Sequence, residues 1–215
     1  MTHFTAQQLD ALDKRYRSNL INCISGYKSA NLIGTQDTKG HENLAIFSSV
    51  VHLGANPPLL GFIMRPTKVV RHTYENIKTT GAYTINHIAQ SWSKKAHQTA
   101  ARYDKEVSEF DKTKLTSCYL ENFNAPYVQE SPVKIGCTFK NEYHIKENNT
   151  RLIVGEIAHL YLESTLLHED GFVQLDRAYI TAINGLDGYA LPQLKERFSY
   201  AKPDHEITSL YHERS

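Results

Sequence analysis

The sequence predicts a mainly β protein, an antiparallel barrel of about six strands with a few helices around it. Two long runs, residues 133–145 and 150–162, flank the polar turn 146–149. Along the second run successive side chains alternate between two faces, as in a β-strand. Most of the predicted strands are joined by turns rather than by helices, which disfavours a doubly wound parallel sheet.

The first third of the chain predicts one helix and three strands. Thr5 and Gln8 form a capping pattern, and apolar residues at helical spacing extend the predicted helix to about Leu20. These apolar residues are Leu9, Leu12, Tyr16 and Leu20. Residues 29–35 and 43–51 are β-prone on either side of a Gly-containing turn and predict a hairpin. Asn56-Pro57-Pro58 predicts a break before a third strand, 59–64.

The remaining elements alternate between helices and strands. A helix is predicted from Arg71 to Thr80, with Gly81 in a typical C-terminal cap position. A fourth strand follows at 82–88. Two helical segments are then expected, at 91–103 and 106–115. A last strand, 177–183, follows the two long strands 133–145 and 150–162.

Composition excludes several classes of protein. The 215 residues, 40% hydrophobic and 22% charged, suit one folded domain over 1–215 that needs no disulfide or metal to stabilise it. The net charge of +1 gives no long-range attraction to nucleic acid or to an acidic membrane. Three cysteines without CxxC spacing, and an N-terminus that lacks a signal peptide's apolar core, predict a cytoplasmic protein. The most apolar stretch is too short to span a membrane.

The common catalytic and nucleotide motifs are absent from the sequence. GxGxxG, GxxxxGK[ST], GxSxG and HExxH do not occur. No catalytic side chain and no metal site are therefore predicted.

The densest group of anion-binding residues lies between the third strand and the following helix. Arg65, Lys68 and Arg71 accompany two threonines and His72, and Thr73 is placed to cap the helix. A helix N-terminus with guanidinium groups beside it suits a phosphate. The alternative interpretation is a solvated basic loop with an ordinary cap.

Small hydroxyl residues mark the predicted strand end ahead of the Pro-rich break. Ser48 and Ser49 would let a planar ligand lie against the backbone, which can offer N–H and C=O groups to its polar edge. By itself, the pair also fits an ordinary strand end.

Taken in order, these segments resemble one known family. The elements are Asn43 through the serine pair, the Asn56-Pro57-Pro58 break with its strand, and the run from Arg71 to Asn86. Ala96-His97 and Glu109-Phe110 resemble the family's helical insertion. Over roughly residues 20–200, the chain resembles the flavin reductase-like family of FMN-binding split barrels.

The resemblance implies a homodimeric, six-stranded Greek-key split barrel over about 20–185, with a helical insertion over about 91–116 and a C-terminal tail over about 186–215. FMN would bind non-covalently near the dimer interface. The implied FMN contacts are the phosphate ligands and the residues along the isoalloxazine edge. They are Arg65, Thr67, Arg71, His72 and Thr73 for the phosphate, and Ser48, Ser49 and Val50 for the ring.

The chain departs from the family at one of these positions. Many relatives have Lys-Asp-Thr where this chain has Arg71-His72-Thr73, and losing a carboxylate there should not harm phosphate binding. Asn76 is expected to brace the helix or a turn. Roles for Lys28 near the flavin and for His87 as a proton donor are left open.

The implied activity is an NAD(P)H-dependent flavin reductase that passes hydride from NADH or NADPH to flavin N5. The reduced flavin of such an enzyme could pass its electrons to a partner monooxygenase or redox protein. Two alternatives stay open: an FMN-binding electron carrier without a nicotinamide site, and a non-enzymatic anion- or nucleic-acid-binding barrel.

Overall fold

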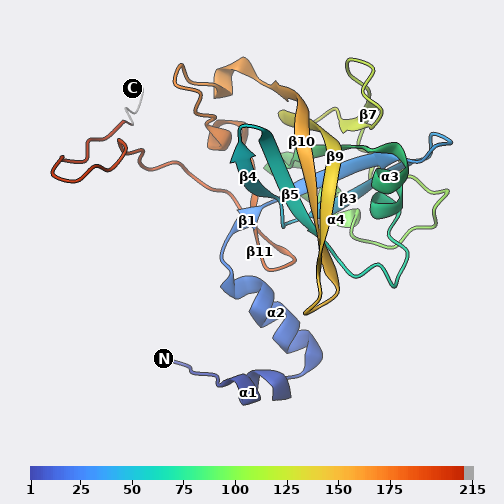
Figure 1. Cartoon of the computed structure of the whole chain (residues 1–215), viewed down its shortest axis with the longest axis horizontal. Coiled ribbons are helices and arrows are strands. Elements are labelled where there is room, and N and C mark those ends of the chain that lie inside the picture. The colour runs from blue at the N-terminus through green and yellow to red at the C-terminus, as the bar shows by residue number, and fades with distance from the viewer. Residues whose placement is uncertain (211–215) are drawn as a thin grey trace.

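The computed structural model describes residues 1–210, and a seven-stranded antiparallel sheet dominates it (Figure 1). The strand order is β3-β2-β6-β9-β10-β5-β4, so the two hairpins β2–β3 and β4–β5 occupy opposite edges. The strands are β2 (Asn31–Gln36), β3 (Glu42–Phe47), β4 (Val51–Ala55), β5 (Pro58–Met64), β6 (Ala82–His87), β9 (Val133–Ile145) and β10 (Thr150–Leu162). The mainly β, antiparallel split barrel is thus confirmed, with seven strands in the main sheet rather than six.

The extra strand is β4, which the sequence analysis merged with β3. The predicted strand 43–51 ends at Phe47, and a new strand begins at Val51. Val51, His52 and Leu53 are all exposed, so β4 lacks the alternation that identifies a half-buried strand. The Pro-rich break is consequently the turn of the β4–β5 hairpin, and Pro58 is the first residue of β5.

The two edges of the sheet meet at the short link between β3 and β4. The Ser49 hydroxyl accepts a hydrogen bond from the Ile63 N–H at 3.1 Å and lies 3.3 Å from the Ile63 carbonyl oxygen, to which it donates. The Phe47 ring packs edge-on against Phe62, with centroids 5.0 Å apart. The end of β3 is therefore fixed to β5, and the sheet curls into a barrel.

Two apolar clusters lie on the two sides of the sheet. The barrel interior contains Phe62, Tyr83 and Ile153 among its fully buried side chains. Gly155 is needed there, because a Cβ at that position would overlap the Tyr83 hydroxyl. The second cluster packs β2 and β3 against the helical insertion, with Trp92 and Phe110 at its centre.

The predicted middle helices are present but shorter than expected. Helix α3 (His72–Thr80) ends at Gly81, whose φ of 71° is the left-handed conformation that glycine favours. The insertion contains a 3₁₀ turn (Gln90–Trp92), α4 (Ser93–Gln98) and α5 (Glu109–Thr113). The short pair β7 (Ser117–Cys118) and β8 (Tyr127–Val128) follows.

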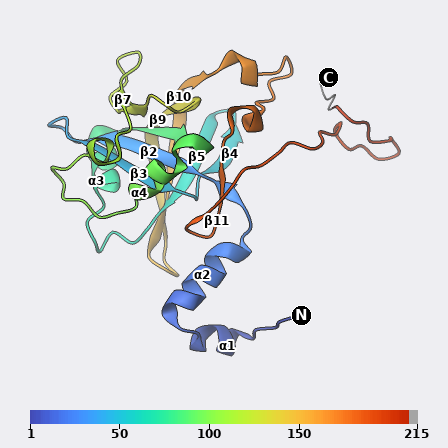
Figure 2. The same cartoon turned by 180° about the vertical axis from the view of Figure 1, so that it is seen from behind.

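The N-terminal residues form an arm of two helices that projects from the barrel (Figures 1 and 2). The predicted capping box of Thr5 and Gln8 is confirmed, but α1 (Ala6–Ala11) ends at once, and Asp13 caps a separate helix, α2 (Lys14–Ile24). The single helix predicted to about Leu20 was wrong because Asp13 accepts bonds from the N–H groups of Arg15 and Tyr16. An N-cap that satisfies these donors starts a new helix.

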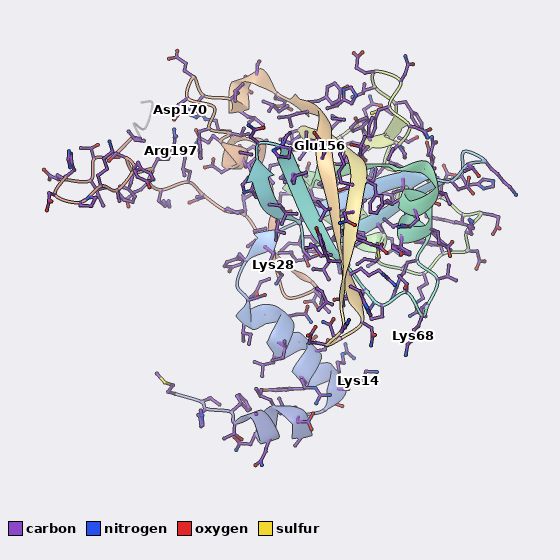
Figure 3. All side chains as sticks on the ribbon, in the orientation of Figure 1. Lys14, Lys28, Lys68, Glu156, Asp170 and Arg197 are labelled. Atoms are coloured by element: carbon purple, nitrogen blue, oxygen red, sulfur yellow. The ribbon has the colours of Figure 1, made fainter. Side chains whose placement is uncertain are left out.

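A small second sheet joins the arm to the C-terminal region. It contains β1 (Lys28–Ser29), β11 (Ala182–Asn184) and β12 (Gly188–Ala190), in the order β1-β11-β12. The strand predicted at 177–183 was largely wrong, because a 3₁₀ turn (Leu175–Ala178) occupies its start; another such turn is Ser164–Leu166. Beyond β12 the tail extends away from the body. Asp170 and Arg197, which form an ion pair, hold its first part (Figure 3).

Candidate functional site: a cationic corner beside a strand end

The predicted phosphate site is the loop 65–71, which connects β5 to α3. Arg71 occupies the N-cap position of α3, and no side chain among residues 1–210 caps this helix. The first-turn N–H groups therefore remain available, next to the positive end of the helix dipole. The expectation that Thr73 caps α3 was wrong, because Thr73 is the second residue of the helix and is only 5% exposed.

Arg71 is the central cation of this corner. Its Nε is buried, and no group within residues 1–210 accepts its hydrogen bond. Burial lowers the pKa of Arg71, and the positive charges of Arg65 and Arg102 lower it further. A guanidinium that is half-buried, close to two like charges and short of an acceptor is well suited to bind an anion.

Arg102 was missed by the sequence analysis. It follows α4 in the helical insertion, 31 positions after Arg71 in the printed sequence, and reaches the corner through the packing of that insertion. In the part of the chain that the structure describes, no ion pair engages Arg65, Arg71 or Arg102. These three arginines are therefore not neutralised by an ion pair with any carboxylate of residues 1–210.

A buried carboxyl group lies behind the corner. Glu109 is 6% exposed and accepts a hydrogen bond from the Leu44 N–H at 2.9 Å. Burial raises the pKa of Glu109, whereas the Leu44 N–H bond and the charge of nearby His72 act in the opposite direction. His72, the first residue of α3, is thus close enough to interact with this acidic group, a proximity that the sequence did not predict.

A polar network fixes the start of α3 on the sheet. Asn43 on β3 donates to Thr73 at 3.0 Å, and Asn76 on α3 donates to Thr35 on β2 at 3.1 Å. All four side chains are buried. Asn76 is confirmed as a structural brace, and the network holds the corner rigidly against the barrel.

The strand-end residues Ser48, Ser49 and Val50 are half-buried and form the link between β3 and β4. The Ser49 hydroxyl is bonded to the backbone of Ile63, and the Val50 carbonyl accepts a bond from Ser29 at 3.4 Å. The Ser48 hydroxyl makes no hydrogen bond to any described residue. Of the two hydroxyls expected to donate to a ligand, the structure leaves that of Ser48 uncommitted.

The structure shows what surrounds Lys28 and His87, the two residues whose roles the sequence left open. The Lys28 ammonium group caps the end of α2, 2.8 Å from the Asn22 carbonyl oxygen and 3.1 Å from the Ser25 hydroxyl (Figure 3). Burial lowers the pKa of His87 to about 4, and its Nδ1 is buried without a partner among the described residues. His87 is therefore neutral at pH 7.

Two surface hollows lie apart from the corner and the strand end. Each has a volume of about 550 Å³, and neither is lined by any of the eight predicted FMN contacts. Within residues 1–210, no three metal-ligating side chains are grouped closely enough to hold an ion. No helix in that range combines the length and the hydropathy of a membrane span.

Comparison with known proteins identifies the family. Residues 25–179 match the flavin reductase like domain. The match covers most of the chain, so the protein belongs to the flavin reductase-like family, as the sequence resemblance indicated. It is an oxidoreductase-family protein with a split-barrel flavoprotein fold.

Solved structures agree with this fold. A Shewanella frigidimarina protein, provisionally described as a flavin reductase with a split barrel domain, is 48% identical with a TM-score of 0.90, covering 94% of this chain and 100% of that one. Nitrilotriacetate monooxygenase component B from Bacillus cereus is 20% identical with a TM-score of 0.78, over 93% and 98% of the two chains. The NADH:FAD oxidoreductase SgcE6 of Streptomyces globisporus is 12% identical with a TM-score of 0.65, over 85% and 97%.

Proposed function

We propose that this protein is an FMN-dependent NAD(P)H:flavin oxidoreductase. The observation that carries the proposal is Arg71. No group within residues 1–210 accepts a hydrogen bond from its buried Nε, and Arg71 lies at an uncapped helix N-terminus near two further arginines. Such a site fits a terminal phosphate ester, which carries up to two charges, better than the internal diphosphate of FAD. The residues present therefore fit FMN.

The chain's own residues would bind and orient the cofactor. Arg65, Thr67, Arg71 and His72 would bind the phosphate together with the first N–H groups of α3. Thr73 would contribute its N–H, and its hydroxyl, which Asn43 fixes, would face the same group. FMN would supply the hydride-accepting N5, and NADH or NADPH would supply the hydride.

The strand end would position the ring. Ser48 would donate its hydroxyl to the polar edge near N5 and O4, whereas Ser49 and Val50 would contribute backbone groups only. Because the Ser49 side chain is bonded to Ile63, this edge would not need to reorganise when the ring charge changes on reduction. No side-chain acid or base is required for hydride transfer.

The proposal extends to assembly and location. A homodimer is expected because a flat cofactor needs most of its surface covered, and the corner and strand end lie outside both surface hollows. The name of the Bacillus cereus neighbour supports a monooxygenase as the acceptor of the reduced flavin. Three free cysteines support a reducing compartment, the cytoplasm, and the chain would act as one domain.

An anaerobic titration tests the activity directly. The protein is loaded with FMN, and its flavin absorbance is followed as NADH and then NADPH is added in separate experiments. Bleaching by either nucleotide supports the reductase. Bound FMN that neither nucleotide reduces would favour the electron carrier, and failure to bind FMN would refute both flavin functions. Parallel loading with FAD tests the preference for the terminal phosphate.

A further inference from the structure

Strand β3 brings together two titratable side chains that are distant in the sequence. Asn43 donates to the Thr73 hydroxyl at 3.0 Å, which holds the start of α3. The next residue, Leu44, donates its N–H to the Glu109 carboxylate at 2.9 Å, which holds α5. Helices α3 and α5 both contact β3, and α3 lies beside it in Figures 1 and 2. His72, which directly precedes Thr73, therefore lies in the same corner as Glu109.

Glu109 favours a positive charge on His72. Its side chain is only 6% exposed, so water and salt screen its interaction with a neighbouring charge weakly. Burial raises the pKa of Glu109, whereas the bonds from the Leu44 N–H and from its own N–H, and the charge of His72, lower it. The interaction is mutual, because a charged imidazole and an ionised carboxyl group stabilise each other.

The arginines of the corner oppose that charge. Arg71 directly precedes His72 in the chain. Burial, and then the charges of Arg65 and Arg102, lower the pKa of Arg71, so the three cations are close enough to repel one another. Like charges disfavour a further proton on a neighbouring group. In the free protein these arginines therefore offset the effect of the buried carboxylate on His72.

The other neighbours of His72 leave the balance to a ligand. On α3, Glu75 lies three residues further along, in the first turn of the helix. Residues 43–47 of β3 carry no charged side chain. A phosphate dianion at the corner would neutralise the arginines, and its own charge would act on His72 in the same direction as the two carboxylates. Binding of the anion therefore favours protonation of the imidazole.

We propose that His72 couples FMN binding to the uptake of a proton, because it holds the phosphate as an imidazolium. The inference deepens the proposed function and rests on it. The proton comes from solvent, the imidazole gains one positive charge, and the phosphate keeps both negative charges. Histidine is the side chain whose ordinary titration falls between pH 5 and 8. The chain would thus bind a terminal phosphate tightly at low pH and exchange it more readily as the pH rises, with Glu109 as a positioning residue.

Calorimetry of FMN binding counts this proton. The full-length protein is titrated at about pH 7.5 in two buffers that differ in ionisation enthalpy, which gives the number of protons taken up per FMN. The wild type should take up about half a proton or more, and His72→Asn should take up almost none. The matched control is His3→Asn, which removes an exposed histidine ahead of α1 and should behave as the wild type.

The affinity measures the same coupling independently. A phosphate monoester loses its second proton near pH 6, so it remains a dianion from about pH 6.5 to about pH 8, whereas a histidine ordinarily loses its charge over this range. FMN affinity should therefore fall about fivefold in the wild type and in His3→Asn. In His72→Lys, whose charge persists across the range, the affinity should stay nearly constant.

A further variant separates positioning from structural support. Glu109→Gln keeps an oxygen that can accept the Leu44 N–H but removes the negative charge. The fall in affinity should then occur at lower pH than in the wild type. A change in melting temperature without this displacement would show that Glu109 acts only on stability, and would remove it from the proposal.

The outcomes distinguish this inference from the proposed function. Bound FMN without proton uptake in the wild type, or uptake that persists in His72→Asn, overturns the inference and leaves FMN binding intact. Release of a proton would mean that the phosphate itself changes protonation, and it also overturns the inference. A wild type that does not bind FMN at all refutes the proposed function.

Discussion

The two halves of the candidate site are built on opposite principles. At the corner, the described part of the chain offers no acceptor for the buried Nε of Arg71 and no side chain that caps the start of α3. At the strand end, the Ser49 hydroxyl and the Val50 carbonyl are already bonded within the protein. The comparison indicates that the corner supplies affinity, because its polar groups await a ligand, and that the strand end supplies a fixed geometry.

The largest effect should come from removing the central cation of the corner. Arg71→Ala loses a charge-assisted bond, so FMN binding should weaken by about 1.5–3 kcal/mol. Isothermal titration calorimetry measures this change, with Lys146→Ala, in the exposed β9–β10 turn, as a charge-matched control. Equal affinities in the two variants would mean that the phosphate is held elsewhere.

A pH experiment tests the burial of His87, which lies near the strand end. His87 pairs in register with Asn31, which pairs on its other side with Phe47, immediately before Ser48. The folded-state pKa of His87, about 4, lies below the usual 6.5, so the folded protein favours the neutral ring.

Stability from this group is therefore complete above pH 6.5 and is lost as the pH falls toward 4. Between pH 7 and pH 5 the loss should be about 2 kcal/mol in the free energy of unfolding. Urea unfolding of the wild type and His87→Gln at both pH values measures it. A variant with the same pH dependence as the wild type would show that His87 does not contribute.

The two serines should separate stability from reactivity. Ser49→Ala breaks the link to Ile63 and should lower the free energy of unfolding by about 1 kcal/mol, measured by urea unfolding. Ser48→Ala removes an uncommitted hydroxyl and should leave unfolding unchanged while slowing flavin reduction by NADH or NADPH, measured by stopped flow. If both variants behaved alike in both measurements, the distinction between these serines would be wrong.

The smallest effect belongs to the third arginine. Arg102 is exposed, so its attraction for the phosphate is screened by water and salt. Arg102→Ala should weaken FMN binding by about 0.5–1 kcal/mol at low salt, and the difference from wild type should shrink at high salt. Titrations at two ionic strengths measure it, and a difference that does not change with salt would exclude a purely electrostatic role.

Local patterns predicted much of the fold. The runs 133–145 and 150–162 match β9 and β10 at both ends because alternation and a polar turn define a long hairpin. Gly81 ends α3 as expected. Strand β4 was not predicted because both of its faces are exposed. The start of α2 was not predicted because Asp13 interrupts an otherwise continuous helical pattern.

The candidate site could be predicted only in part. The cluster around Arg71 is contiguous in sequence, so its residues were visible together. Arg102 and Glu109 reach the corner only through the packing of the insertion, and no local pattern reveals that proximity. Nor could the sequence show that the Ser49 hydroxyl is bonded to Ile63 across the barrel.

The uncapped start of α3 means that a bound phosphate would complete the helix as well as occupy a site. The amide hydrogens of residues 72–74 should exchange freely with solvent in the free protein and become protected when FMN binds, because the phosphate oxygens then serve as their acceptors. Cofactor loading would accordingly complete the hydrogen bonding of the first turn of α3 without lengthening the helix, and hydrogen exchange would register it even if nothing else moved.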